Sequence, residues 1–487
     1  MSLPIREMLL PRPPEAEEGR GVTCPFSRLK EIETDPALLS CAEALNRALA
    51  RLEEPPRRIL TEKINLGIAE RIVLSLCPAE EGRGEESYVL HIQEDAISIR
   101  GGGVPGVFYG IQSLLQILFT VSAEGGHAIY LPTGTIHDSP RFPYRGLMLD
   151  SARHFQRKER ILELLEEMAA YKLNRLHWHF TDRQSWRIEL DSAPELSGAV
   201  FDRRSYYNQG FYTKKDVEEI RQFARERFIT LVPEIEMPGH SAVVFQHHPE
   251  FACPVTDDPA GNDVREYCLS SPEAEAFLKA VLDEVLELFP DSPVIHIGGD
   301  EAGTYYWKRC PRCRKRMKEL NLSSERELEA LFMRGMEDHL LSRGRRAMVW
   351  GGASCSHYTA SALIQDWLGN ASEDALRCGN EIVSSLHGNL YFDYPFALTE
   401  SIREWQKLTY EYDPVPADCP EEKKPLFAGL EGCLWTERIP QRRLTVRSFP
   451  RLRALSESAW ATPEQKNFED FLLRERRLIE SGFSRYS

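Results

Sequence analysis

The sequence lacks a long apolar run, a signal-peptide pattern and an excess of positive charge, and each absence excludes a class of protein. We expect no membrane partner, because no stretch approaches the ~20 apolar residues of a membrane span. The amino-terminal stretch MSLPIREMLLPRPPEAEEG is soon interrupted by prolines and acids, which predicts a cytoplasmic protein without a secretory signal. A net charge of −15 would repel phosphates, so we also expect no nucleic-acid partner.

Internal repeats and low-complexity tracts are also missing, and the eleven cysteines are an odd number scattered along the chain. Without a secretory signal, this pattern predicts mostly reduced thiols rather than a disulfide framework. The remaining composition, 42% apolar and 28% charged residues, is typical of a globular protein. A chain of 487 residues is long enough for two or three domains and a sizeable core.

The chain divides into two units with different patterns. In residues 1–138, the stretches RIVLSLC and ESYVLHIQEDAISIRG alternate like strands, and GVFYGIQSLLQILF has helical periodicity. This predicts a small amino-terminal α+β domain. The turn-rich stretch LPTGTIHDSPRFP predicts a boundary, after which residues 139–487 form the second domain.

Strand, loop and helix alternate through the second domain. The eight strand candidates are YRGLMLDSA, RLHWHFTD, TLVPEIEMPG, VIHIGGDE, AMVWGGA, LIQDWLG, EIVSSLH with NLYFD, and AGLEGCLWTE. Helical stretches between them include KERILELLEEMAAYKL, KKDVEEIRQFARERF, PEAEAFLKAVLDEVLELF and SERELEALFMRGMEDHLL. Eight such units predict an α/β fold with a (β/α)8 TIM barrel, and a doubly wound open sheet is the alternative. Residues 394–425 are long and only weakly helical.

Almost every predicted strand ends in polar or aromatic side chains. In a barrel these ends converge on one face, where active sites lie, whereas a single Asp, Trp or Tyr there often only caps or packs. The candidates are Asp150, Arg153, Asp182, Glu236, His240, Asp300, Glu301, Trp350, Trp367, Tyr391, Asp393, Trp435 and Glu437.

Three interpretations fit these strand ends. His177 and His179 in HWH point to one side, as a metal pair would, but the strands that should supply further ligands offer Trp350 and Trp367. A non-catalytic sugar-binding barrel explains the aromatic side chains and leaves Asp300 beside Glu301 without a purpose. Glycoside hydrolysis needs a carboxylic acid that is protonated near neutral pH.

The pair Asp300–Glu301, in VIHIGGDEAG, favours the third interpretation. Two close carboxylates cannot ionise independently, so one helps to keep the other protonated. As sequence neighbours they start out pointing in different directions, which suits an acid beside a group that orients something else. They are poor candidates for an acid and a nucleophile on the two sides of one bond.

These residues resemble a known family. The motifs RGLMLDSARHF, YKLNRLHWHFTD, PEIEMPGH, HIGGDE, YFD and LWTE occur in the order and approximate spacing of family 20 glycoside hydrolases, the β-N-acetylhexosaminidases. The resemblance covers roughly residues 142–470, and the amino-terminal unit resembles the small domain that precedes the barrel in that family. HIGGDE together with RGLMLDSARHF is a highly specific combination.

The resemblance implies substrate-assisted catalysis, in which the sugar's 2-acetamido oxygen attacks the anomeric carbon and forms an oxazolinium ion. Glu301 is then the general acid and later the base that activates water. Asp300 accepts the acetamido N–H and stabilises the developing positive charge. Tyr391 donates to the acetamido oxygen and holds it for attack.

The resemblance also assigns substrate-binding residues: Arg153 for O3 and O4, Asp182 and His240 for support of the acid and the sugar, Trp350 and Trp367 for the acetamido pocket, Trp435 under the pyranose, and Asp393 and Glu437 for the O4 and O6 hydroxyls. Two departures concern Arg183, where the family often has a second acid, and the SLHGNLYFD stretch, which lacks a common proline. Glu236 is interpreted as support behind the site.

The expected function is therefore a retaining exo-β-N-acetylhexosaminidase acting on terminal non-reducing GlcNAc or GalNAc. Another retaining β-glycosidase and a non-hydrolytic carbohydrate-binding barrel are the alternatives. The expected partner is a carbohydrate with a terminal N-acetylhexosamine, and the family resemblance also allows a homodimer. The preferred sugar and the aglycone are left open.

Catalysis of this kind requires no cofactor or metal, but one structural metal site is a further candidate. Cys310 and Cys313 in CPRC have the spacing of half a zinc site, and Cys253 and Cys268 form a second half if adjacent βα loops bring them close. The alternatives are two reduced pairs or a local disulfide. The basic run KRCPRCRKRMK is interpreted as solvated surface.

Overall fold

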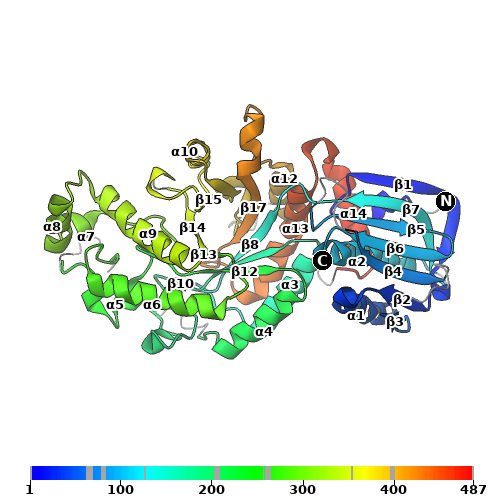
Figure 1. Cartoon of the computed structure of the whole chain (residues 1–487), viewed down its shortest axis with the longest axis horizontal. Helices are drawn as coiled ribbons and strands as arrows, with labels where there is room; N and C mark the ends of the chain where they lie inside the picture. Colours follow the sequence, from blue (N-terminus) through cyan, green and yellow to red (C-terminus); the bar gives the residue numbers. More distant parts are fainter. Residues whose placement is uncertain are drawn as a thin grey trace.

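The computed structural model describes residues 3–61, 70–77, 84–125, 128–201, 209–255, 257, 265–352, 355–394 and 401–484. A small sheet domain and a barrel lie side by side along the long axis of the molecule (Figure 1). Helices α7 (Tyr305–Arg309) and α8 (Pro311–Glu319) lie at the end of the barrel that is far from the small domain.

The small domain is a seven-stranded mixed sheet. Its strands, in spatial order, are β1 (Glu15–Pro25), β7 (Tyr130–Asp138), β5 (Tyr88–Ile92), β6 (Ala96–Gly101), β4 (Arg71–Leu76), β2 (Glu31–Thr34) and β3 (Arg58–Leu60). β1, β7, β5 and β6 pair antiparallel, while β6, β4, β2 and β3 pair parallel. Helices α1 (Leu39–Leu49) and α2 (Val104–Ala123) complete the predicted α+β domain.

Helix α2 corrects one prediction. Its 20 residues include no charged side chain and are long and apolar enough to cross a membrane by length and composition. The prediction that no stretch approaches this limit was therefore wrong. Most of α2 is buried inside the molecule, where it contacts β5 and β6, as the core helix of a domain does.

The second domain is a closed parallel barrel. Its strands are β8 (Tyr144–Asp150), β9 (Arg175–His179), β12 (Thr230–Glu234), β13 (Val294–His296), β14 (Arg346–Trp350), β15 (Leu363–Asp366), β16 (Glu381–Ser384) and β17 (Phe427–Leu434), and β17 pairs with β8. The eight predicted strand positions and the (β/α)8 barrel are confirmed, so the open-sheet alternative is wrong. The NLYFD part of the seventh prediction is wrong, because Asn389 and Leu390 end a short helix and Tyr391 forms only an isolated bridge with Cys433. We propose a domain boundary between residues 138 and 139, because β7 ends at Asp138 and β8 begins at Tyr144.

Helices surround the barrel. They are α3 (Lys158–Ala170), α4 (Lys214–Arg225), α6 (Pro272–Leu288), α9 (Glu325–Ser342), α10 (Ser372–Cys378), α12 (Ile402–Glu411) and α13 (Gln441–Trp460). The last helix, α14 (Phe468–Glu480), contacts α12 and α2 of the small domain. The βα connections also contain the β10 (Thr181–Asp182) and β11 (Ser185–Trp186) hairpin and the short helices α5 (Ala242–Phe245) and α11 (His387–Leu390), besides α7 and α8. The four helical stretches predicted from periodicity became α3, α4, α6 and α9. In the weakly helical stretch 394–425, α12 is present, and residues 395–400 lie outside the described residues.

Side-chain chemistry explains where these helices begin and which face they bury. Thr213 starts α4 with a capping box, in which its hydroxyl accepts from the Asp216 N–H. Ser271 and Ser324 cap α6 and α9 by accepting from the backbone N–H three residues further on. Helix α3 buries Ile161, Leu164, Leu165 and Met168 on one side, as its periodicity predicts.

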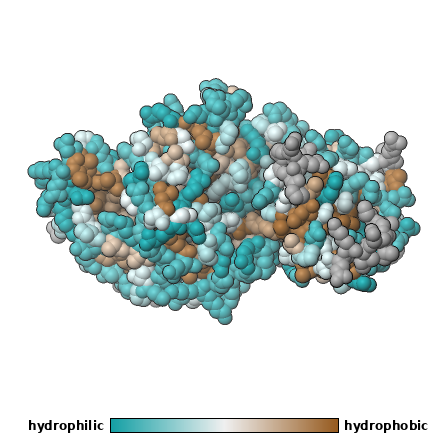
Figure 2. All heavy atoms as spheres, viewed as in Figure 1, coloured by the Kyte–Doolittle hydropathy of each residue, from teal (hydrophilic) through white to brown (hydrophobic). Residues whose placement is uncertain are grey.

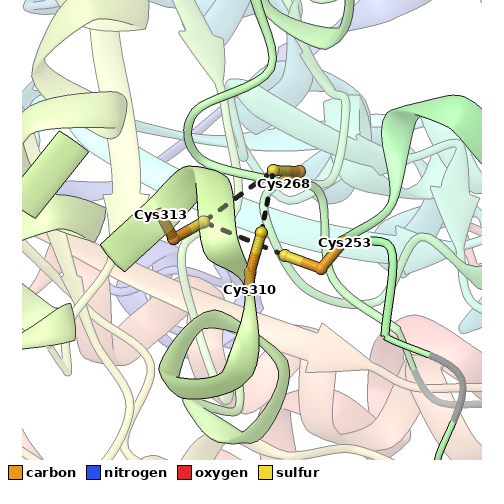
Figure 3. Close-up of side chains that lie close together, drawn as sticks. All are labelled: Cys253, Cys268, Cys310 and Cys313. Atoms are coloured by element: carbon orange, nitrogen blue, oxygen red, sulfur yellow. Dashed lines mark hydrogen bonds between the residues drawn. The ribbon is translucent and has the colours of Figure 1, made fainter. Parts of the chain in front are cut away.

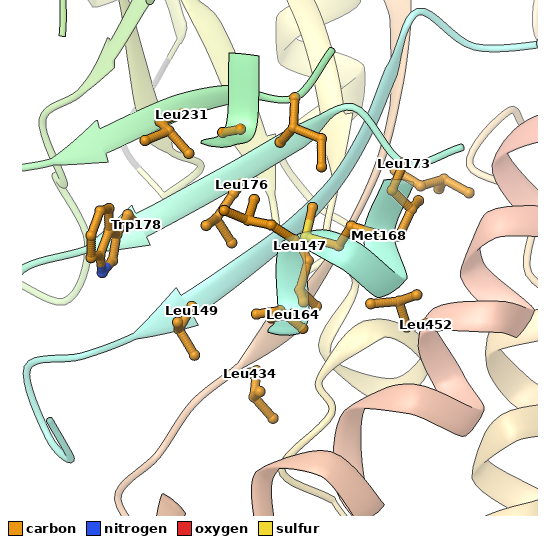
Figure 4. Close-up of a cluster of buried hydrophobic side chains, with 14 of the residues drawn as sticks. Leu147, Leu149, Leu164, Met168, Leu173, Leu176, Trp178, Leu231, Leu434 and Leu452 are labelled. Carbon is orange, nitrogen blue, oxygen red and sulfur yellow. The ribbon is translucent and has the colours of Figure 1, made fainter. Parts of the chain in front are cut away.

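The core of the barrel domain lies between its strands and its outer helices. In Figure 4, leucines of β8, β9 and β17 face Leu164 and Met168 of α3 and Leu452 of α13. The face shown in Figure 2 is mostly hydrophilic, with hydrophobic residues in small groups. Burial of apolar side chains therefore stabilises the barrel, and the polar candidate residues lie at the strand ends.

The small domain contacts the amino-terminal end of the barrel through buried ion pairs, which we call the junction network: Glu86, Asp138, Arg145, Lys172, Asn174 and Trp460. The Arg145 guanidinium donates to both Glu86 oxygens, at 2.7 and 2.9 Å. Lys172 Nζ lies 2.8 Å from Asp138, which also accepts from Trp460 Nε1 at 2.7 Å. Asn174 donates to Glu86 at 2.9 Å.

Candidate active site

The carboxyl-terminal strand ends converge around a hollow of roughly 320 Å³. Nine of the eleven residues predicted for catalysis and substrate binding line it: Arg153, His240, Asp300, Glu301, Trp367, Tyr391, Asp393, Trp435 and Glu437. The other two, Asp182 and Trp350, are almost completely buried just beneath. Tyr394 and Arg438 also line it; sequence reasoning missed them, although each follows a predicted residue at the same strand end.

The turn that carries Asp300 and Glu301 depends on two glycines. After β13, Gly298 and Gly299 adopt φ of +68° and +104°, and Glu301 itself has φ of +50°. A Cβ at Gly298 would lie 1.9 Å from Glu236 Oε1, so a larger residue would displace this carboxylate. The Gly299 N–H donates to Glu236 Oε1 at 3.3 Å, which places Glu236 behind the site, as interpreted from the sequence.

His240, in the loop after β12, lies between Asp182 in the loop after β9 and the acid pair in the loop after β13. Its Nδ1 lies 3.5 Å from Asp182 Oδ1, and its Nε2 lies 3.5 Å from Glu301 Oε2 and 3.8 Å from Asp300 Oδ2. Burial disfavours a charged imidazole, but the carboxylates of Asp182, Glu301 and Asp300 outweigh it and raise the pKa of His240 well above its usual value. A left-handed backbone at His240, φ +48°, is the kind of strain that functional sites retain.

The pKa values of the two neighbouring acids shift in opposite directions: that of Glu301 is lowered and that of Asp300 is raised. A general acid is expected to have a raised pKa, so Glu301 differs from this expectation. Contact with His240 lowers the pKa of Glu301 and outweighs its partial burial. Burial, followed by repulsion from Glu234, Asp182 and Glu301, raises the pKa of Asp300 despite the opposing charge of His240. The Glu301 side chain is 59% exposed and that of Asp300 only 15%, so solvation accounts for much of the difference.

Arg153 forms the cationic side of the hollow. Its Nη2 lies 2.6 Å from Asp182 and 3.8 Å from Glu437, its Nη1 lies 3.3 Å from Asp150, and its guanidinium carbon is 4.9 Å from the centre of the Trp435 ring. Asp182, although buried, has its pKa lowered because Arg153 and His240 outweigh the desolvation. Arg183 is one of the two departures from the family pattern, and its backbone N–H donates to Asp182 Oδ1 at 2.5 Å.

Aromatic side chains wall the hollow. Trp367 and Tyr391 are nearly parallel, with ring centres 6.4 Å apart, and Trp435 lies edge-on to Tyr391 at 6.0 Å and 5.6 Å from Trp350. Trp350 and Trp367 are fixed by N–H donation to Glu234 and to the Gly351 carbonyl. Burial raises the pKa of Tyr391, so its hydroxyl remains a hydrogen-bond donor at neutral pH.

The two histidines of the HWH motif belong to a buried hydrogen-bond network beneath the hollow. His177 hydrogen-bonds to Glu431 and Glu234, and His179 hydrogen-bonds to Glu234 and Asp182. All four ring nitrogens of His177 and His179 therefore have carboxylate partners. Burial would raise the pKa of Glu234, but His179, His296 and His177 outweigh it and lower that pKa well below its usual value.

Sequence reasoning missed Glu431 and His296 in this network. The available signal was the charged Glu431 inside the apolar stretch AGLEGCLW, because a buried acid in a strand needs partners. His296, in VIHIGG, points into the barrel and lies 2.8 Å from Glu234.

The hollow contains acceptors that lack donors. Asp300 Oδ1 and Asp393 Oδ1 are buried and have no hydrogen-bond partner within the described residues. Burial and repulsion from Glu437 and Asp150 raise the pKa of Asp393 to about 7. Such atoms are costly in a folded protein unless a ligand supplies the donor. Acceptors beside aromatic walls, a guanidinium and an acid pair suit a hydroxyl-rich ring with an amide substituent.

A second hollow, of roughly 400 Å³, lies at the opposite end of the barrel near the small domain. Its lining includes Glu85, Glu86, Arg175 and Arg221 and none of the predicted site residues. Size alone therefore does not identify the site; the convergence of strand ends does.

Comparisons with known proteins agree with this geometry. The model of "Glycosyl hydrolase family 20, catalytic domain" matches residues 142–463, and that of "Glycosyl hydrolase family 20, domain 2" matches residues 7–139. A β-hexosaminidase of Porphyromonas gingivalis is 36% identical over 411 residues, which cover 80% of this chain and 52% of that protein. One of Akkermansia muciniphila is 30% identical over 406 residues, covering 79% and 81%.

Solved structures are similar over the whole chain. The family 20 exo-β-N-acetylglucosaminidase of Vibrio harveyi, in complex with N-acetylglucosamine, has a TM-score of 0.86 at 29% identity and covers 100% of this chain and 78% of that one. The chitobiase of Flavobacterium johnsoniae has a TM-score of 0.85 at 27% identity, with 100% and 74% covered. This chain thus spans about half of the Porphyromonas protein and most of the structural relatives.

Proposed function

Because the chain belongs to glycosyl hydrolase family 20, we propose that it is a retaining exo-β-N-acetylhexosaminidase acting on terminal non-reducing β-linked N-acetylglucosamine or N-acetylgalactosamine. The observation that carries this proposal is the buried Oδ1 of Asp300, which has no donor within the part of the chain that the structure describes and lies beside Glu301 in a hollow walled by Tyr391 and tryptophans. An acetamido N–H supplies the donor that Asp300 lacks.

In the first step, the acetamido oxygen of the substrate attacks the anomeric carbon while Glu301 gives its proton to the leaving glycosidic oxygen. Tyr391 donates to the acetamido oxygen and holds it in line, a contribution that is largely entropic. The bond to the aglycone breaks with its electron pair on the protonated oxygen, and an oxazolinium ion forms. Asp300 stabilises the positive charge that develops on the acetamido group.

In the second step, Glu301 acts as a carboxylate base on water, which opens the oxazolinium ion with net retention. The lowered pKa of Glu301 suits this half of the reaction. In the first half, an aglycone covers the exposed Glu301 side chain, and the lost solvation raises its pKa toward that of an acid. His240, positively charged and within 3.5 Å, keeps the side chain oriented in both halves.

Arg153, Asp393 and Glu437 line the hollow and suit the recognition of the sugar hydroxyls. Trp435 offers a flat apolar face with Arg153 beside it. A pocket of this kind admits one terminal sugar, which supports exo action. A substrate that lacks the acetamido group loses both a buried contact and its nucleophile.

The test is release of p-nitrophenol from the β-N-acetylglucosaminide, the β-N-acetylgalactosaminide and the plain β-glucoside. We expect turnover of the acetamido sugars only, and a fall in kcat of about 10²–10⁴-fold in Glu301→Gln. Glu250→Gln is the matched control, since Glu250 has a similar exposure of 56% and lies outside the hollow. Comparable turnover of the glucoside would show that the enzyme supplies its own nucleophile. Binding without any turnover would favour a carbohydrate-binding barrel.

A further inference from the structure

Four cysteines from two βα connections converge at the far end of the barrel (Figure 3). Cys253 and Cys268 belong to the connection between β12 and α6, and Cys310 and Cys313 lie at the start of α8, between β13 and α9. Each is almost fully buried, with at most 2% of its surface exposed. The structure therefore brings together the two halves that the sequence suggested.

The sulfur positions match a tetrahedron. The Sγ atoms lie 3.9 Å apart for Cys253 and Cys313, 3.8 Å for Cys268 and Cys310, and 3.8 Å for Cys268 and Cys313. All four lie within 4.8 Å of one another. Four thiolates around one Zn²⁺ at Zn–S distances of about 2.3 Å would be separated by roughly 3.8 Å. A disulfide requires a separation of about 2.05 Å, and all four cysteines are free.

We propose that Cys253, Cys268, Cys310 and Cys313 bind one structural Zn²⁺ as thiolates. Sulfur ligands in a tetrahedral set select zinc among the common divalent ions. Four protein ligands close the coordination sphere, so the ion holds the fold and takes no part in glycoside hydrolysis. The proposal does not depend on the proposed enzymatic function.

The surrounding charge fits such a site. Zn²⁺ with four thiolates carries a net charge of −2, and the segment around the last two ligands is strongly basic in an otherwise acidic chain: Lys308, Arg309, Arg312, Arg314, Lys315, Arg316 and Lys318. Arg312 donates to the Ala252 carbonyl at 3.2 Å, next to Cys253. Cys310 and Cys313 also lie at the amino-terminal end of α8, whose dipole favours thiolate. The basic run, which the sequence analysis interpreted as solvated surface, therefore lies where it can balance the negative charge of the proposed zinc site.

The proposed zinc site lies between two loops that also carry active-site residues. The connection after β12 carries His240, and the connection after β13 carries Glu301, so an ion between them ties together the two loops that meet at 3.5 Å in the hollow. Hydrogen bonds already join these loops, from Trp307 Nε1 to the Tyr267 carbonyl at 2.9 Å and from the Gly303 N–H to Glu266 at 2.8 Å. Four metal–sulfur bonds would make this junction much harder to open.

The test measures metal in the full chain, purified under reducing conditions without chelators. We expect about one zinc per chain by elemental analysis, and its release when a mercurial reagent titrates the thiols. Replacement by Co²⁺ should give the visible absorption of tetrahedral thiolate-bound cobalt. Cys313→Ser should lose both signals, while Cys41→Ser, a change at a buried cysteine of α1 in the small domain, should keep them.

Each outcome decides the proposal, even if Cys313→Ser fails to fold, because the mercurial titration uses the unaltered chain. A chain that holds no metal after incubation with zinc and dialysis would overturn the zinc proposal. In that case, eleven titratable thiols would indicate a reduced cysteine cluster, and fewer would indicate disulfides. Iron in place of zinc would also overturn it. Loss of zinc should lower the unfolding temperature. The metal content is read without any substrate, so a failed zinc proposal is distinct from a failed enzymatic one.

Discussion

The two ends of the barrel both bury charged side chains, but they differ in whether those charges have partners. At the amino-terminal end, Glu86 receives four hydrogen bonds, two from Arg145 and one each from Asn174 and Tyr109. At the carboxyl-terminal end, Asp300 and Asp393 each keep a buried oxygen without a donor within the described residues. A satisfied network stabilises a fold, whereas unmet acceptors are retained for a ligand.

The acidities of the carboxyl groups express the same difference. Burial tends to raise the pKa of Glu86, but the guanidinium of Arg145 and the amide of Asn174 outweigh it and lower that pKa. Burial dominates at Asp300 and Asp393, and the pKa of each is raised. Burial alone therefore does not distinguish a structural acid from a functional one; its partners do. Variants at the two ends should accordingly affect different properties.

Lys172→Met should break the junction network most severely. It removes the cation 2.8 Å from Asp138 and leaves a buried carboxylate without its charge partner, which costs about 3–5 kcal/mol of unfolding free energy. Urea denaturation measures this loss, and kcat of the folded fraction should stay unchanged. Lys279→Met, in an exposed pair with Glu275, should change stability by no more than about 0.5 kcal/mol. Equal losses in the two variants would contradict the structural role of the network.

Asp300→Asn should affect activity and not stability. It removes the negative charge that compensates the developing positive charge and replaces one carboxylate oxygen with an NH2 donor, so kcat/KM should fall by about 10²–10³-fold. Because burial disfavours the ionised Asp300, the neutral amide should leave the unfolding free energy equal or higher. Asp338→Asn, on the exposed side of α9, is the control for the same substitution. A destabilised Asp300→Asn would mean that this end of the barrel is structural as well.

His240→Gln should shift the pH dependence of the reaction. The imidazolium lowers the pKa of Glu301 and opposes the rise in the pKa of Asp300. A neutral side chain should therefore move both limbs of the kcat/KM profile to higher pH, because these limbs report the free enzyme. His339→Gln, a change at a histidine that pairs with Asp283 away from the hollow, should leave the profile in place. An unmoved profile in His240→Gln would exclude electrostatic coupling to the acid pair.

The sequence predicted the barrel and the strand-end residues because parallel strands map sequence position directly onto one face of the fold. It also paired Cys253 and Cys268 with Cys310 and Cys313, since they follow neighbouring strands. It did not predict which acid holds the proton, because the pKa of Glu301 depends on His240, which lies on another loop.

Two further failures have physical reasons. The apolar helix α2 exceeded the length rule for a membrane span, because a core helix and a membrane helix share the same composition. The network around Glu431 was missed because pattern analysis treats a strand as an apolar run and overlooks a single charge. That charge hydrogen-bonds to His177 and accepts from Gln365 of β15, a partner that only the closed barrel supplies.

Asp393→Asn and Glu86→Gln should show the smallest effects, with opposite signs. The pKa of Asp393 is raised from 3.8 to about 7, so the folded chain binds more protons than the unfolded one in this window, and the unfolding free energy falls as pH rises through it. Asp393→Asn lacks this loss, so its stability relative to the unaltered chain should increase between pH 5 and pH 8. The increase should be on the order of 1 kcal/mol, because water in the hollow relieves part of the desolvation of Asp393.

The pKa of Glu86 is lowered, so its contribution to stability is present above the unfolded pKa and is lost as pH falls. Glu86→Gln should therefore be more destabilising at pH 8 than at pH 4. Urea titrations at the three pH values measure both, and trends of the same sign would remove the distinction between the two ends of the barrel.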